Sequence, residues 1–294
     1  MQKELLPNLA NREKHLESYL GKYPAKEVLE VGKSILGKSI YCYKIGSGKK
    51  NILAVGAHHG MEYITASVLY DFIDFITEKS ARGVSSYGIN LAFLLEKFTF
   101  WIIPCVNPDG VEMHLCGQEN SPLMKRQIIM NGSGDFSAWQ ANSRGVDLNH
   151  NYNAGFMEYK RIEMRENILP GKTRFSGEYP ESEPETRAVA SFVRVLAPNM
   201  LISFHTQGGE IFYSPKSERV FKIAHRAAKS VGYEAKEAAG HSAYGGLSDY
   251  AGGVLGIPSF TVELGKGTNP LPFSSLGSLS LVARKLLILL PTYL

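Results

Sequence analysis

Apolar and polar residues along the chain follow two different periods, which predicts an α/β fold. Four short apolar runs have the length of buried strands: residues 52–55, 98–103, 200–204 and 259–262. After the first run, apolar residues recur at the four-residue spacing of a helix: Ile64, Val68, Phe72 and Ile76. Further helices are expected after the capping-box pattern Ser-Glu-Pro-Glu at 182–185, over 216–231 and over 274–290. Strand-like and helix-like segments therefore alternate, as they do in α/β proteins.

The segment from Gly110 to Phe175 lacks this periodicity and is rich in Asn, Gly and Ser, so we expect it to be mostly irregular. A loop of this length inside a compact domain is usually functional. No repeat, low-complexity tract or linker marks a boundary, so residues 1–294 are expected to form one domain. Residues 1–30 are interpreted as an N-terminal helical extension of that domain.

The ends of the predicted strands carry the residues of greatest chemical interest. His58, His59 and Glu62 follow the first run, Asp109 follows the second, His205 follows the third, and Glu263 follows the last. Open α/β sheets bind ligands at the carboxyl ends of their strands. We therefore expect these side chains to gather at one edge of the sheet.

Composition excludes several classes of protein and function. The 294 residues are 44% apolar and 20% charged, which is ample material for a buried core. A net charge of +4, spread along the chain, does not indicate a nucleic-acid partner. Cys42, Cys105 and Cys116 have no CxxC spacing, so neither a disulfide framework nor a cysteine-based zinc site is expected.

The two ends of the chain lack the patterns of targeting or membrane segments. The charged first twenty residues contain no continuous apolar stretch of a signal peptide, so a cytoplasmic location is expected. The apolar stretch 276–290 is short for a bilayer span and contains Arg284 and Lys285, so no membrane association is expected. Nothing in the sequence indicates an oligomeric state.

The residues at the strand ends match the needs of a hydrolytic zinc site. Such a site uses three His or carboxylate ligands, and a neighbouring carboxylate takes a proton from the attacking water. His59 and Glu62 are three residues apart and can face one ion, with His205 as the remote third ligand and Glu263 as the base. Taken singly, each residue also has a structural interpretation: a histidine beside a strand is usually only hydrogen-bonded, and Glu263 alone could be a buried ion-pair partner.

Five motifs, in their order and spacing, resemble the carboxypeptidase A-like zinc peptidases. They are residues 56–65 (GAHHGMEYIT), 107–110 (NPDG), 145–149 (GVDLN), 203–205 (SFH) and 260–264 (FTVEL). The resemblance runs from about Val31 to the C-terminus. It implies one zinc ion per chain held by His59, Glu62 and His205, with Glu263 as the catalytic base. It also implies a twisted, mixed but mostly parallel sheet of about eight strands, with helices on both faces.

The expected substrate pocket departs from the pattern of ordinary carboxypeptidases. In that family an Asn-Arg pair clamps the substrate's terminal carboxylate, whereas here Asn149 is followed by His150. The family also places an oxyanion-stabilising Arg just after a Trp, at the position of Gln140. Arg144 is a candidate for the missing cation, although a solvated loop charge is an equally good interpretation. Histidine lacks the bidentate fork of arginine, so simple C-terminal trimming is in doubt.

A narrower branch fits these departures better. Residues 205–213 (HTQGGEIFY), 135–139 (DFSAW), 265–272 (GKGTNPLP) and 182–186 (SEPET) resemble the γ-D-glutamyl-diamino acid peptidases, which cut bacterial cell-wall (murein) peptides. Such substrates carry extra carboxylates and an amine, so a remodelled clamp is expected. By the family's register, Tyr244 is a candidate for the mobile tyrosine that covers the substrate. Asp249 is placed to meet an ammonium group, and Ser248 stands at the base of the pocket.

The leading hypothesis is therefore a zinc metallopeptidase that hydrolyses the γ-D-glutamyl–meso-diaminopimelate bond of small murein peptides. A conventional metallocarboxypeptidase, or a zinc amidohydrolase of N-acyl amino acids, is the alternative among enzymes. A catalytically silent murein-peptide-binding domain is the alternative outside enzymes. The intact set of His59, Glu62, His205 and Glu263 argues against that last alternative, because a binding domain has no need of the base.

Overall fold

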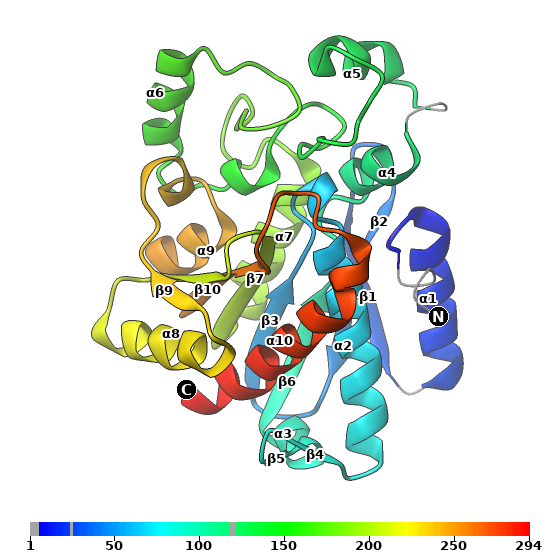
Figure 1. The fold of residues 1–294 in the computed structure, drawn as a ribbon, viewed down its shortest axis with the longest axis vertical. Helices are drawn as coiled ribbons and strands as arrows, with labels where there is room; N and C mark the ends of the chain where they lie inside the picture. The colour runs from blue at the N-terminus through cyan, green and yellow to red at the C-terminus, as the bar shows by residue number, and fades with distance from the viewer. Residues whose placement is uncertain (1–5, 24–25, 118–120) are drawn as a thin grey trace.

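An eight-stranded sheet forms the centre of the computed structural model, which describes residues 6–23, 26–117 and 121–294 (Figure 1). Its strands are β1 (Glu27–Lys33), β2 (Ser39–Ile45), β3 (Lys50–Val55), β6 (Phe98–Ile103), β7 (Met200–Thr206), β8 (Glu210–Ser214), β9 (Glu234–Lys236) and β10 (Ser259–Leu264). A separate small hairpin pairs β4 (Ser85–Ser86) with β5 (Ile89–Asn90).

The strand order places four parallel strands in the middle of the sheet. The order is β1-β2-β6-β3-β7-β10-β8-β9, and neighbours from β6 to β10 run parallel. The pairs β1·β2, β2·β6 and β10·β8 are antiparallel, and β9 pairs parallel with β8 at the far edge. The expected mixed, mostly parallel sheet of about eight strands is confirmed.

Helices cover both faces of this sheet (Figure 1). One face carries α1 (Leu9–Lys22), α2 (Ile64–Ala81), α3 (Leu91–Lys97), α8 (Glu218–Val231) and α10 (Leu276–Leu289). The other face carries α7 (Pro184–Leu196) and the short α9 (Leu247–Asp249). The remaining helices, α4 (Pro108–Cys116), α5 (Met124–Asn131) and α6 (Phe156–Glu166), lie at the end of the molecule where the parallel strands finish.

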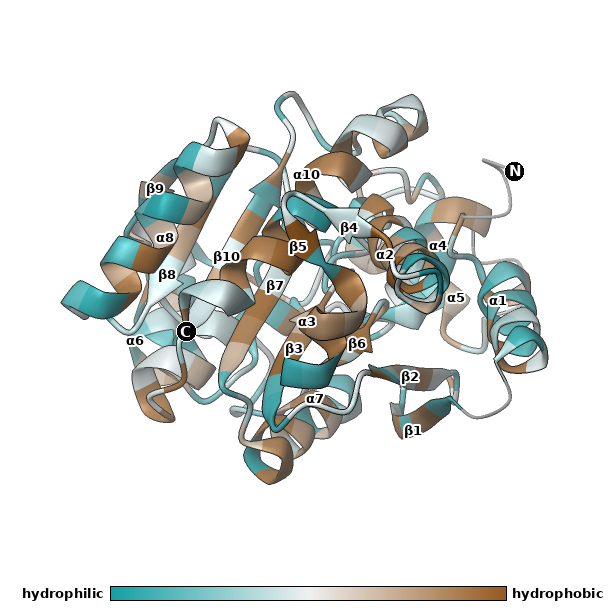
Figure 2. Cartoon of the chain, turned by 90° about the horizontal axis from the view of Figure 1, so that it is seen from below, coloured by the Kyte–Doolittle hydropathy of each residue, from teal (hydrophilic) through white to brown (hydrophobic). Residues whose placement is uncertain are grey.

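Each central strand supplies both cores with alternate residues. In β3, Ile52 and Ala54 pack under α2, whereas Leu53 and Val55 pack under α7. All four side chains are fully buried, which explains why the strand reads as a continuous apolar run. In the view of Figure 2, the hydrophobic colour follows the central strands and the helix faces turned toward them.

The predicted strands are confirmed, with small differences in their limits. Residues 98–103 match β6, and β7 and β10 each continue two residues beyond the predicted end. His205 and Glu263 are therefore the penultimate residues of hydrogen-bonded strands and do not lie in loops. The predicted helix at 216–231 begins at Glu218, because the Ser217 hydroxyl caps it by accepting the Val220 N–H at 3.3 Å.

The expectation of a mostly irregular segment from 110 to 175 is confirmed for the larger part of it, but the segment also contains helices that were not predicted. Most of α4, with α5 and α6, lies within it, while residues 118–120 fall outside the described structure. These helices are 8 to 11 residues long; α5 and α6 bury one and three residues, whereas α4 buries five of its nine. Their apolar spacing is too sparse for a pattern-based prediction. The start of α7 also differs, since Ser182 does not cap it and Glu183 is the N-cap residue.

Both ends of the chain pack on the sheet. Within the predicted N-terminal extension, α1 is helical but β1 begins at Glu27, and residues 1–5 and 24–25 lie outside the described residues. Near the other end, the segment Phe273–Tyr293 has a mean hydropathy of 1.5, which by length and composition would allow it to cross a membrane. In the fold, its helix α10 packs against α2, α8 and β10 and buries seven side chains, so its apolar residues form part of the core.

The packing of α2 on the sheet predicts the effect of a core truncation. Phe72 is fully buried, with its ring 5.8 Å from that of Phe100 on β6. We expect Phe72→Ala to lower the free energy of unfolding by about 3–5 kcal/mol, because it leaves a cavity under α2. Phe93→Ala, at a helical position that is 54% exposed, should change it by less than about 0.5 kcal/mol. Urea unfolding of the metal-free protein measures both, and equal effects would contradict this description of the core.

Candidate functional site

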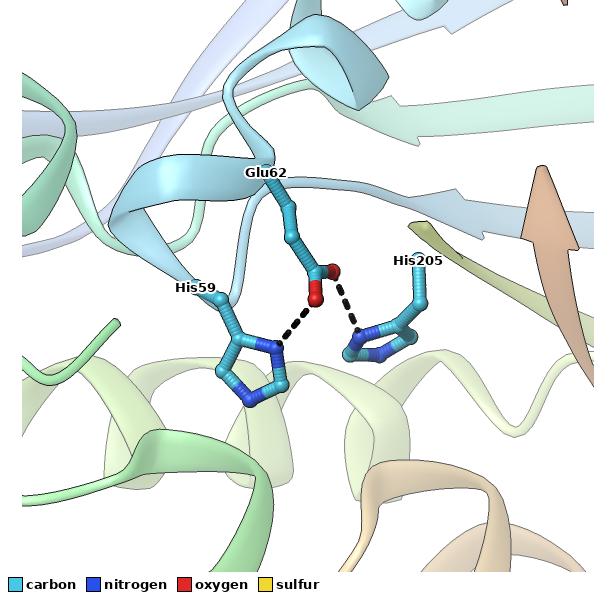
Figure 3. A group of neighbouring side chains, drawn as sticks. All are labelled: His59, Glu62 and His205. Atoms are coloured by element: carbon cyan, nitrogen blue, oxygen red, sulfur yellow. Dashed lines mark hydrogen bonds and ion pairs between the residues drawn. The ribbon is translucent and has the colours of Figure 1, made fainter. Parts of the chain in front are cut away.

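Three side chains from separate elements converge where the central parallel strands end. His59 and Glu62 lie between β3 and α2, and the 3-10 turn η2 (Gly60–Glu62) begins directly after His59. His205 is the penultimate residue of β7. Because β3 and β7 are parallel neighbours, their carboxyl ends bring the three residues together. Figure 3 shows the side chains pointing toward one another.

The Glu62 carboxylate lies between the two imidazole rings. Its Oε1 is 3.0 Å from His59 Nδ1, and its Oε2 is 3.2 Å from His205 Nδ1 (Figure 3). One ligand atom from each of the three residues lies within 4.8 Å of the others. Glu62 and His205 are buried, and the His59 side chain is 14% exposed. The prediction that these residues meet at one point is therefore confirmed.

Two further groups hold Glu62 in place. The Thr206 backbone N–H donates to Oε2, and the Asn269 side-chain amide donates to Oε1, both at 3.2 Å. Asn269 also bonds Thr206 twice, through the backbone carbonyl at 2.8 Å and the hydroxyl at 2.7 Å. The loop after β10 is thereby attached both to Glu62 and to the residue that follows His205.

Asp147 orients His59 from the opposite side. Its Oδ1 is 3.1 Å from His59 Nε2, so the ring can present Nδ1 to an ion. The Asp147 carboxylate also accepts the backbone N–H groups of Asn149 and Arg174, each at 3.1 Å. A carboxylate that binds the outer nitrogen of a ligand histidine fixes its tautomer and raises its basicity.

These buried carboxylates create a strong preference for positive charge. Burial alone would lower the pKa of His59, but the charges of Glu62 and Asp147 outweigh it and raise that pKa well above its usual value. Burial alone would raise the pKa of Glu62, yet His59 and His205 bring it down to about 2. The imidazoles thus favour the charged form of Glu62, and a cation bound beside it would do the same.

The donor set fits a zinc ion. Among the described residues, His205 Nε2 is a buried ring nitrogen with no hydrogen-bond partner, and the buried His59 Nδ1 faces the Glu62 carboxylate at 3.0 Å. Two imidazoles and one carboxylate form the ligand set of hydrolytic zinc sites, which leave one position open for water or substrate. Assignment of these residues as ligands rests on this geometry and remains a prediction.

Glu263 lies beside this group because of the register of the sheet. β10 runs parallel to β7 with Glu263 opposite His205. Side chains alternate between the two faces of a strand. Phe260, Val262 and Leu264 face the core on one side, so Glu263 faces the site on the other. Burial, together with the nearby Glu62 carboxylate, raises the pKa of Glu263 well above its usual value. A carboxylate with raised proton affinity beside a metal site suits the role of a general base.

The other residues at the strand ends are structural. His58 is fully buried, with Nε2 3.0 Å from the Tyr152 hydroxyl and its ring stacked on His205. Burial lowers the pKa of His58, so this imidazole is neutral. Asp109 is buried away from the three residues and pairs with Lys38 at 2.8 Å.

The Gln140 backbone lies beside the site, whereas the Arg144 side chain is engaged elsewhere. The backbone carbonyl of Gln140 accepts the Gly60 N–H at 2.9 Å, which places it directly beside the zinc-site turn. The Gln140 side-chain oxygen accepts the Thr173 hydroxyl, so its amide N–H groups can donate to a substrate. Arg144 pairs with the buried Glu183, with nitrogens 2.9 and 3.0 Å from one carboxylate oxygen. That ion pair competes with its predicted role as a substrate cation.

His150 binds protein groups, and it does so as a neutral ring. Its Nδ1 is 2.9 Å from the Tyr244 carbonyl oxygen, and its ring stacks on Tyr159 at 4.0 Å. Burial lowers the pKa of His150, although Asp147 opposes this. The Tyr244 ring covers Gly155, where a Cβ would lie 2.6 Å from the ring, so only glycine fits there. The predicted substrate contacts of His150 and Tyr244 are not tested by this arrangement.

A small pocket opens beside the candidate base. Its walls include Asn149, Tyr213, Ser248, Asp249, Thr261 and Glu263. The Asn149 side-chain oxygen accepts the Leu247 N–H at 3.2 Å, which ties the turn η3 (Leu148–His150) to α9. Burial raises the pKa of Asp249 to about 6, and no ion pair with Asp249 is found among the described residues.

Sequence comparison assigns the family. Residues 13–279 match the family described as zinc carboxypeptidase. The chain belongs to the zinc carboxypeptidase family. Because members of the family bind zinc, the His59–Glu62–His205 group is consistent with one zinc site, and the predicted membership is confirmed.

Two relatives illustrate where the chain stands within zinc carboxypeptidases. It is 32% identical over 260 residues to γ-D-glutamyl-L-diamino acid endopeptidase 1 of Lysinibacillus sphaericus, covering 86% of this chain and 64% of the relative. It is 29% identical to the uncharacterized protein YqgT of Bacillus subtilis (strain 168), covering 89% of this chain and 70% of the relative. The chain thus spans about two thirds of the length of these two relatives.

Solved structures share the zinc carboxypeptidase fold. Bovine thrombin-activatable fibrinolysis inhibitor, in complex with tick carboxypeptidase inhibitor, has a TM-score of 0.75 at 23% identity, covering 97% of this chain and 96% of that one. Murein-tripeptide amidase MpaA from Escherichia coli O157 has a TM-score of 0.57 at 19% identity, covering 89% of this chain and 91% of that one. At these identities the likeness shows the fold alone.

Sequence reasoning missed two residues that support the zinc carboxypeptidase site. Asp147 and Asn269 lie within motifs that were noted, but their partners are 88 and 207 residues away in the chain. Such pairings have no local sequence signal. Only the polar character of both residues beside apolar positions hints at a buried hydrogen bond.

The contact between Asp147 and His59 predicts a loss of metal affinity. We expect Asp147→Asn to weaken zinc binding about 10- to 100-fold, because the amide cannot stabilise the outer nitrogen of His59 as a carboxylate does. Competition with a chelator of known affinity measures this. Asp135→Asn, at an exposed loop position, is the matched control and should bind zinc as the parent does. Unchanged affinity in a folded Asp147→Asn protein would refute the supporting role.

Proposed function

We propose that this zinc peptidase hydrolyses the bond between γ-D-glutamate and a diamino acid such as meso-diaminopimelate in murein peptides. The similarity to the Lysinibacillus sphaericus endopeptidase, over 86% of this chain, supports the proposal. A protein of the same fold, the amidase MpaA, is named for a related class of substrate, a murein tripeptide. These names describe the relatives, and the substrate of this chain rests on its own pocket.

The observation that carries the proposal is the carboxylate of Asp249 in the same pocket as Glu263. Asp249 has no ion-pair partner among the described residues, and its Oδ2 lies against Gly246, where a Cβ would be only 2.8 Å away. An unpaired, mostly buried carboxylate beside the scissile bond is suited to the ammonium group of a diamino acid. A pocket for ordinary apolar side chains has no use for it.

The residues at the family's two arginine positions, Gln140 and His150, also favour a substrate other than an ordinary C-terminal peptide. Gln140 offers an uncharged amide where the family pattern has an Arg, and neutral His150 stands where the clamp arginine would be. The free α-carboxylate of γ-linked D-glutamate lies off the main peptide path, so a clamp fitted to an ordinary C-terminus would not match it. Hydrogen-bond donors such as Gln140 and Asn149 are compatible with this altered geometry.

The side chains of this chain divide the reaction between them. His59, Glu62 and His205 would hold the zinc, which polarises the scissile carbonyl and lowers the pKa of water. Glu263 takes a proton from the attacking water as oxygen adds to the γ-carbonyl carbon. Glu263 then returns the proton to the leaving nitrogen as the C–N bond breaks. The products are a γ-carboxylate on glutamate and the free amine of the diamino acid.

Removal of the base tests the proposal directly. The parent protein loaded with zinc should release diaminopimelate from L-Ala-γ-D-Glu-meso-diaminopimelate, as read by mass spectrometry. Glu263→Gln should lower the rate at least a thousandfold while zinc stoichiometry stays at one, because the amide cannot accept the proton. Glu218→Gln, at a glutamate on α8 whose side chain is 81% exposed, is the matched control and should retain activity.

Other outcomes distinguish the alternatives. Cleavage of ordinary C-terminal peptides alone, abolished by Glu263→Gln, would retain the mechanism and replace the substrate with that of a conventional carboxypeptidase. Release of an N-acyl group alone would favour an amidohydrolase. Binding of the murein peptide without cleavage by the zinc-loaded parent would favour a silent binding domain.

A further inference from the structure

An ion pair between Lys216 and Glu237 lies next to the pocket that contains Asp249. Lys216 Nζ lies 2.8 Å from Glu237 Oε2, and the Tyr213 hydroxyl donates to Glu237 Oε1 at 3.3 Å. Lys216 follows two residues after Ser214, and Glu237 directly precedes Ala238. Ser214 and Ala238 line the pocket, and so does Tyr213, whose hydroxyl bonds Glu237, so the pair lies next to the pocket.

The pair is held loosely. The Lys216 side chain is 66% exposed and that of Glu237 is 51% exposed, so solvent screens their attraction. An incoming anion can therefore replace Glu237 as the partner of Lys216 at little cost. The residues that line the pocket itself include two carboxylates and no cation, and Lys216 is a cation that acts on one of them, Asp249.

Asp249 and Lys216 also act on each other. Burial raises the pKa of Asp249, and the cation of Lys216 is the charged side chain that opposes this rise. The pocket is thus lined by the negative group of Asp249, and the positive group of Lys216 lies near enough to act on it. This arrangement complements a side chain that ends in both an ammonium and a carboxylate group.

We propose that Lys216 and Asp249 together form a zwitterion-recognition site that selects a diamino dicarboxylic acid over a simple diamino acid. The inference rests on the proposed function and specifies its substrate class. The side chain of meso-diaminopimelate ends in one carbon that carries an ammonium and a carboxylate. Lysine has the same chain length and ammonium group but lacks that carboxylate. Asp249 binds the ammonium common to both, and Lys216 leaves Glu237 to bind the carboxylate that only the first possesses.

A crossed comparison of variants and substrates tests this assignment. The zinc-loaded parent, Lys216→Met and Asp249→Asn are assayed on L-Ala-γ-D-Glu-meso-diaminopimelate and on L-Ala-γ-D-Glu-L-Lys. We expect Lys216→Met to lower kcat/KM about fivefold on the first peptide and less than twofold on the second. Asp249→Asn should lower kcat/KM at least about tenfold on both peptides.

Two further variants make the test specific. Lys222→Met removes another exposed lysine that pairs with a neighbouring glutamate on α8, and it should leave the ratio of the two rates unchanged. Glu237→Gln removes the competing partner of Lys216, and it should raise kcat/KM on the diaminopimelate peptide alone. This substitution at the surface also keeps the test decisive if Asp249→Asn does not fold.

The outcomes separate this inference from the proposed function. Cleavage of both peptides by the parent, with a ratio unchanged in Lys216→Met and Glu237→Gln, would overturn zwitterion recognition and leave the proposed function standing. Cleavage of neither peptide by the zinc-loaded parent would overturn the proposed function, and this inference with it.

Discussion

The buried carboxylate of Glu62 is the group on which the rest of the site depends. A second buried carboxylate, Asp147, lies on the far side of His59, so two negative charges share a region with little water. Ions in such a region are stable only when charge and hydrogen bonds compensate for lost hydration. The Asn269 amide, the Thr206 N–H and the imidazoles of His59 and His205 supply that compensation, and a zinc ion held by the three residues would add to it. Metal binding and the stability of this end of the sheet are therefore linked.

The sheet could be predicted because its central strands are buried on both faces. β3 and β7 are continuous apolar runs bounded by polar residues, and the residues after them matched the chemistry of a zinc site. The short helices α4, α5 and α6 could not be predicted, since they bury few apolar residues and end at positions set by tertiary contacts. The likeness to the family supplied the roles of His59, Glu62, His205 and Glu263, which the residues alone left open.

The substrate side of the site was predictable in residue type but not in partners. His150, Gln140 and Arg144 were each identified from departures in sequence motifs. Their neighbours, Tyr159, Thr173 and Glu183, lie 9 to 39 residues away along the irregular segment, so no local pattern reveals the pairing. In the proposal, the charges that meet the substrate belong to Asp249, which lines the pocket, and to Lys216, which lies next to it. Positive charge on the ordinary clamp positions is replaced by neutral hydrogen-bonding groups.

The pairing of Glu263 with His205 across two parallel strands links chemistry to strand alignment. Side chains along β10 alternate between the core and the site, so a slip of one residue would bury the carboxylate and present Val262 or Leu264 in its place. Because the register of paired strands changes in steps of whole residues, Glu263 either faces the site or does not. A chain with a shifted register would therefore have no activity. The activity of a preparation per bound zinc would then report the fraction of its molecules in which β7 and β10 pair in the native register.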